Sequence, residues 1–109
     1  MIRVYIGKAG DKRQILSTGH AGYGAYGEDI VCAAVSALVT SFAMWLEDKA
    51  DREEISVEKM DVQDGFVNII YEDPEGIAKE TMKMTRTGLE AIAEKYFSNL
   101  SVNGGEIIF

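Results

Sequence analysis

The chain has 109 residues, the size of one domain, so we expect a single domain over residues 1–109. Its 11 Lys and Arg stand against 18 Asp and Glu, and this net charge of −7 disfavours a general binder of nucleic acid or of anionic membranes. One Cys and one His exclude an intrachain disulfide and a Cys/His zinc site, and we expect neither a metal nor another cofactor.

The first five residues lack the pattern of a signal peptide. The longest apolar stretch, residues 30–46, contains three hydroxyl side chains and is about one residue too short to span a membrane. We therefore expect a cytoplasmic protein that does not bind a membrane, in a compartment where the free thiol stays reduced.

Residues 2–6 alternate apolar and polar side chains, which predicts a strand buried on one face. Residues 7–11 predict a hairpin turn, and residues 14–18 a second strand. A loop with glycines at 19, 22, 24 and 27 follows, and then a helix over residues 28–50 with Glu28 and Asp29 in its first turn.

The second half repeats this order. Strands are expected at residues 55–60 and 65–71, an amphipathic helix at 75–99, and a last strand within 101–109, whose register the Asn-Gly-Gly sequence leaves open. The order β-β-α-β-β-α-(β) predicts an α+β fold, in which two helices pack on a small antiparallel or mixed sheet of four to five strands. The alternation in the first strand indicates a sheet covered mainly on one face.

Three stripes run along the first expected helix. At 100° per residue they are a broad apolar arc, a stripe of small side chains and a narrow polar seam that carries the thiol. We expect this helix to be buried around most of its circumference. One sheet and one further helix cover only part of it, which favours a homodimer. The stripes contain, in that order, Val31, Val35, Leu38, Phe42, Trp45 and Leu46; Ala33, Ala37 and Ser41; and Asp29, Cys32, Ser36 and Thr40.

The glycine-rich loop is the first feature that suggests a function. Residues 22–27 match G-x-G-x-x-G, but no βαβ unit follows and the chain has no room for a doubly wound sheet, so a dinucleotide site is disfavoured. Closely spaced glycines instead favour a mobile loop that closes over an apolar ligand. The expected substrate loop comprises Gly22, Tyr23, Gly24, Tyr26 and Gly27, and neither tyrosine has an evident partner.

Cys32 has two interpretations. It is a small buried hydrophobic residue, or it is a nucleophile near a helix N-terminus with His20 as its base across the loop. His20 alone would be a strand-end residue bonded to the loop. Asp29 either orients the imidazole or the loop backbone, or is an ordinary acid at a helix start. The Ser36 hydroxyl serves a ligand or the thiol, or bonds the carbonyl of Cys32.

Two segments carry a resemblance to a known family. Residues 19–21 read Gly-His-Ala, residues 29–36 read Asp-Ile-Val-Cys-Ala-Ala-Val-Ser, and eleven residues separate His20 from Cys32. This pattern resembles the signature of the Prp family of ribosomal-processing cysteine proteases, and the element order resembles that family over the whole chain. The resemblance implies Cys32 as nucleophile and His20 as general base, with Gly19, Asp29 and Ser36 as supporting residues.

The resemblance further implies a dimeric cysteine endopeptidase with a mobile loop. Such an enzyme removes a short N-terminal extension from a large-subunit ribosomal protein, cutting after an apolar motif rich in Phe. The alternative is a non-enzymatic, ribosome-associated binding module whose Cys and His are structural. A redox or thiol-transfer protein is disfavoured, because the chain has no second Cys to resolve an oxidised thiol.

Overall fold

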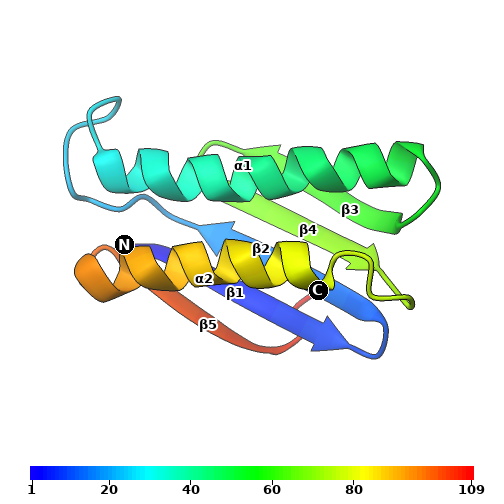
Figure 1. Cartoon of the computed structure of the whole chain (residues 1–109). Helices are drawn as coiled ribbons and strands as arrows, with labels where there is room; N and C mark the ends of the chain where they lie inside the picture. The colour runs from blue at the N-terminus through cyan, green and yellow to red at the C-terminus, as the bar shows by residue number, and fades with distance from the viewer.

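Both helices lie on the same face of one five-stranded mixed sheet (Figure 1). The computed structural model describes all 109 residues. The sheet has the order β3-β4-β2-β1-β5, and every neighbouring pair is antiparallel except β1 and β5. The α+β fold and the element order expected from the sequence are confirmed. The elements are β1 (Ile2–Ala9), β2 (Lys12–Thr18), α1 (Ile30–Asp51), β3 (Ser56–Gln63), β4 (Phe66–Glu72), α2 (Lys79–Lys95) and β5 (Leu100–Glu106).

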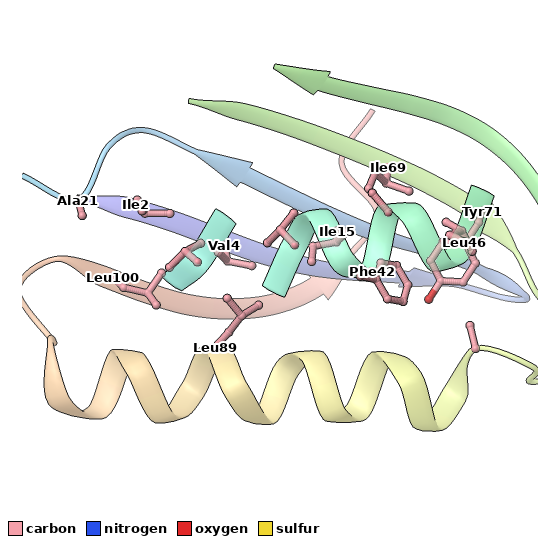
Figure 2. Close-up of a cluster of buried hydrophobic side chains, with 14 of the residues drawn as sticks. Ile2, Val4, Ile15, Ala21, Phe42, Leu46, Ile69, Tyr71, Leu89 and Leu100 are labelled. Atoms are coloured by element: carbon pink, nitrogen blue, oxygen red, sulfur yellow. The ribbon is translucent and has the colours of Figure 1, made fainter. Parts of the chain in front are cut away.

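The core fills the space between this sheet and the two helices (Figure 2). Alternate residues of the strands point toward the helices, as the period of two requires. Each fully buried aliphatic or aromatic side chain contributes about 1.5–3 kcal/mol to the stability of the fold. The most deeply buried side chains are Val4 on β1, Ile15 on β2, Ile69 and Tyr71 on β4, Phe42 and Leu46 on α1, and Leu89 on α2.

Both helices begin later than the sequence pattern suggested. Asp29 does not lie in the first turn of α1 but caps it, accepting hydrogen bonds from the amides of Val31 and Cys32, and Glu28 is exposed in the loop before it. Similarly, Asp73 accepts from the amides of Ile77 and Ala78, so the chain turns there before α2 begins. The first and last turns of a helix carry no unique periodicity, so charge patterns alone misplace its ends.

The expectation that α1 is buried around most of its circumference is wrong. Its inner side packs on the sheet and on α2, while the small-residue stripe Ala33, Ala37 and Ser41 is exposed, next to Met44. Because no other part of the chain covers this stripe, it is free to contact a partner.

By length and composition the 22-residue helix could cross a membrane, a test that the core helix of a soluble protein also passes.

The C-terminal tail crosses the sheet face that the helices leave open. Gln14, whose neighbour Ile15 faces the core, is fully buried on that other face. Its side-chain amide accepts from the backbone N–H of Ile108 at 2.9 Å, donates to the carbonyl of Ile108 at 2.6 Å and donates to Asn68 at 2.8 Å. Gly7 lets the tail pass, because a Cβ there would lie 3.0 Å from the Cα of Ile107.

Gln14→Ala should therefore loosen the tail and lower the free energy of unfolding by about 2 kcal/mol, because it leaves buried polar groups without partners. Hydrogen exchange should show faster exchange of the Ile108 amide. Gln63→Ala, which removes an exposed Gln bonded to Asp61, is the matched control and should change stability by less than about 0.5 kcal/mol. Equal effects of the two substitutions would contradict this role for Gln14.

Candidate active site

A cavity of about 600 Å³ opens where β2 leaves the sheet and α1 begins. Its walls are the glycine-rich loop, the first turns of α1 and the β3–β4 hairpin. The polar seam expected along α1 faces this cavity. The expected site residues that line it are Gly19, His20, Gly22, Gly24, Tyr26, Gly27, Asp29, Cys32 and Ser36.

Cys32 is half-buried in the first turn of α1, and its sulfur faces the preceding loop. The backbone N–H of Ala21 donates to Sγ across 3.2 Å. This donor and the partial positive charge of the helix N-terminus both lie close to the sulfur. The local environment of Cys32 thus suits a nucleophile better than a simple core residue.

One carboxylate holds the loop and the helix start together. Oδ1 of Asp29 accepts from the amides of Val31 and Cys32 at 3.0 and 2.9 Å, and Oδ2 accepts from the amides of Tyr23 and Gly24 at 2.9 and 3.2 Å. The pKa of this carboxyl lies below 3.8, mainly because the Cys32 amide donates to the charged form. Burial raises the pKa, and the hydrogen bonds from the other three amides lower it further. Asp29 therefore orients the loop backbone and also acts as the acid at the start of α1, so both of its expected interpretations apply, and it forms no hydrogen bond with the thiol.

His20 is exposed and its ring lies against Gly65, in the turn between β3 and β4. Gly65 has φ of 75°, and a Cβ on it would lie 2.7 Å from Nε2 of His20. The amide of Gly19 donates to the carbonyl of Gly65 at 2.9 Å, which ties the end of β2 to the same turn. His20 and Cys32 line one cavity, but no hydrogen bond joins them.

The two loop tyrosines differ, which the sequence did not predict. The ring of Tyr23 packs edge-on against Tyr96, with centroids 5.2 Å apart, so the expectation that it has no partner is wrong. Tyr23 does not line the cavity, whereas Tyr26 does and is 86% exposed. Ser36 also lines the cavity, and of its two expected roles the local bond to the Cys32 carbonyl is not formed. Tyr26 and Ser36 are thus the loop and helix side chains free to meet a ligand.

The comparisons with known proteins place this chain in a family. The model of the family described as "Cysteine protease Prp" matches residues 1–101. The chain belongs to the Prp family of cysteine proteases. No curated protein matches it in sequence.

Solved structures agree with the Prp assignment. One is the essential ribosomal processing protease Prp from S. aureus in complex with a covalently linked product peptide; it is 27% identical, with a TM-score of 0.78 over 95% of this chain and 99% of that one. Another is SMU.848 from Streptococcus mutans, 28% identical, with a TM-score of 0.66 over 98% and 96% of the two chains. A second S. aureus Prp structure, with a substrate peptide, is 23% identical and supports the fold, with a TM-score of 0.65 over 95% and 99%.

Two parts of this candidate site were missed by the sequence analysis. Residues 62–67 of the β3–β4 hairpin form the wall opposite α1. Asn99 donates from Nδ2 to the carbonyl of Ala21 at 2.9 Å, and so anchors the residue whose own N–H meets the Cys32 sulfur. No local signal could identify Asn99, because 78 residues separate it from Ala21 and the sequence placed it at a helix end.

Asp29→Ala should free the loop and fray the start of α1. The pKa of Asp29 is lower in the folded chain than in the unfolded chain, so its stabilisation is present above pH 3.8 and is lost as the pH falls through the lowered pKa. The gap in melting temperature between the parent and Asp29→Ala should accordingly close at low pH. Glu28→Ala, at an exposed neighbouring acid, is the control and should show no such gap. A gap that persists well below pH 3.8 would contradict this assignment.

Proposed function

We propose that this chain is a ribosomal-processing endopeptidase that removes a short N-terminal extension from a large-subunit ribosomal protein. The observation that carries the proposal is the opening of the Cys32 thiol and the His20 imidazole into one cavity of a Prp-family chain. The S. aureus relative, described as a ribosomal processing protease with a covalently linked product peptide, supports both the substrate class and a covalent step.

In the proposed reaction His20 accepts the thiol proton, and Sγ of Cys32 attacks the scissile carbonyl carbon. The tetrahedral intermediate collapses to a thioester as the peptide C–N bond breaks and His20 gives its proton to the leaving amine. Water then attacks the thioester, with His20 as base, and releases the new carboxylate and the thiol. Substrate binding must bring the imidazole into contact with the sulfur, because no hydrogen bond joins them in the free chain.

Three amides in the first turn of α1 are already occupied and do not serve as oxyanion donors. The amides of Val31 and Cys32 donate to the Asp29 carboxylate, and the amide of Ala33 donates to the Asp29 carbonyl. The N–H of Ala21 lies within hydrogen-bond distance of the reacting sulfur. We propose that this N–H donates to the oxygen of the tetrahedral intermediate, on which the negative charge develops. Asn99 would hold that donor in place.

The shape and charge of the chain suit the proposed substrate. Val62, Phe66 and Val67 give the cavity an apolar wall, which fits an apolar cleavage motif containing Phe. The net charge of −7 attracts a basic ribosomal protein. We further propose that the enzyme is cytoplasmic and forms a homodimer, for which the exposed small-residue stripe of α1 is the candidate contact.

The rival function is a non-enzymatic, ribosome-associated binding module with a structural Cys and His. The missing hydrogen bond between the two side chains favours it, and so does the contact of His20 with Gly65. The two functions differ in thiol reactivity. A nucleophilic thiol reacts with iodoacetamide in the native state, whereas a structural thiol reacts after unfolding.

Cys32→Ala should abolish cleavage of a peptide that spans the N-terminal extension of the host ribosomal protein, as measured by mass spectrometry. The substitution removes one sulfur from a half-buried side chain, so the melting temperature should change little. Thr87→Ala, which removes an exposed hydroxyl of α2 outside the cavity, is the control and should retain cleavage. Residual cleavage by Cys32→Ala would rule out the protease function.

His20→Ala should lower the cleavage rate by orders of magnitude and slow the alkylation of Cys32 at neutral pH, because the thiol loses its base. Gln63→Ala removes another polar side chain of the cavity and should leave alkylation unchanged. Equal alkylation rates for His20→Ala and the parent chain would show that His20 does not activate Cys32.

A further inference from the structure

A second cavity, of about 610 Å³, lies at the opposite end of the strands from Cys32. The first cavity takes in Ser17 near the end of β2 and Phe66 at the start of β4, whereas the second takes in Arg13 and Tyr71 at the other ends of the same strands. Its remaining walls are β1, β5 and the first half of α2. The two cavities share no lining residue, so the peptidase chemistry does not explain the second one.

This second cavity gathers positive charge in an acidic chain. Five of the 11 Lys and Arg line it, namely Lys8, Arg13, Lys79, Lys83 and Arg86. Of these, Arg86 alone forms an ion pair, in which Nε meets Glu90 at 2.9 Å and the terminal nitrogens stay free. Asp73 is the one carboxylate in the lining, and its two oxygens already accept the amides of Ile77 and Ala78. The uncompensated cations make the cavity a site for an anion.

The hydroxyl of Tyr71 is a second, independent sign of a ligand. The side chain is 1% exposed and lines the cavity, and its hydroxyl opens on the cavity without a hydrogen-bond partner within the chain. Figure 2 shows the ring reaching from β4 toward the helix layer. Burial raises the pKa of this phenol far above 10, and the charge of Asp73 adds to the effect while Arg13 opposes it. Tyr71 is therefore a neutral donor, placed to meet an acceptor in the cavity.

Size and lining narrow the class of anion. A concave volume of this size suits a small molecule rather than a long polymer. The side chains of Ile6 and Met82 supply an apolar wall beside the cations. An extended polyanion such as RNA would be repelled by the net charge of −7 beyond the cavity mouth. These features together fit a ligand with phosphate at one end and a flat, weakly polar group at the other.

We propose that this cavity binds a phosphorylated small molecule of nucleotide size. Lys79, Lys83 and Arg86 on α2 would hold the phosphates, with a hydrogen bond from the Tyr71 hydroxyl. Ile6 and Met82 would pack against the base or another flat group. The proposal concerns a different cavity from the peptidase site and does not depend on the proposed function.

Isothermal titration calorimetry on the full chain tests the proposal, with inorganic pyrophosphate and ATP as separate probes. The parent chain should bind both, and ATP more tightly. Tyr71→Phe should weaken binding roughly tenfold without lowering the melting temperature, because the lost hydroxyl has no partner within the chain. Lys79→Gln with Lys83→Gln should weaken binding at least as much. Lys59→Gln with Lys95→Gln makes the same change of charge away from the cavity and should leave binding within about twofold.

Three results would overturn the proposal. The first is no heat with either probe at millimolar concentration. The second is an equal loss of binding affinity in the cavity variant (Lys79→Gln with Lys83→Gln) and in the control variant (Lys59→Gln with Lys95→Gln), which would indicate attraction by overall charge. The third is tighter binding of a single-stranded RNA oligonucleotide or of a polyglutamate peptide than of ATP, which would indicate a macromolecular surface instead. Peptide cleavage by the same variants is a separate measurement and does not bear on this outcome.

Discussion

The site depends on one carboxylate that serves two segments of backbone at once. Asp29 caps α1 through two amides and holds the loop through two more, so a single side chain sets where the helix begins and how the loop returns to it. Cys32 lies in that first turn, and its place relative to the loop follows from the same bonds. Four backbone N–H groups donate to the Asp29 carboxylate and balance its negative charge. The sulfur of Cys32 accepts from another N–H, that of Ala21.

The two ends of the same strands have opposite characters. At the end near Cys32, the chain leaves β2 through Gly19, and the turn at Gly65 provides the surface on which the His20 ring lies. At the other end, cations from β1, β2 and α2 line the cavity on which the hydroxyl of Tyr71 opens. The length of the strands thus separates the cavity of the thiol from the positively charged cavity.

The sequence predicted those features that depend on neighbours along the chain. Alternation in β1 and the helical period around Phe42 are local, so the element order and the one-sided sheet followed from them. The lone Cys and the lone His also led from the sequence to the cavity that both residues line, since each residue type occurs once in the chain. Helix ends and the burial of α1 were misjudged, because caps and neighbours rather than periodicity decide them.

The tertiary structure alone decided how distant segments meet. The bond from Asn99 to Ala21, the contact of Tyr23 with Tyr96 and the wall formed by residues 62–67 join parts of the chain that no local pattern links. The same holds for the cations around Tyr71, which come from strands and a helix far apart in sequence. A sequence specifies the chemistry of each side chain and the period of each element. Which side chains share a cavity follows from sheet order and register, which are set when the apolar faces pack together.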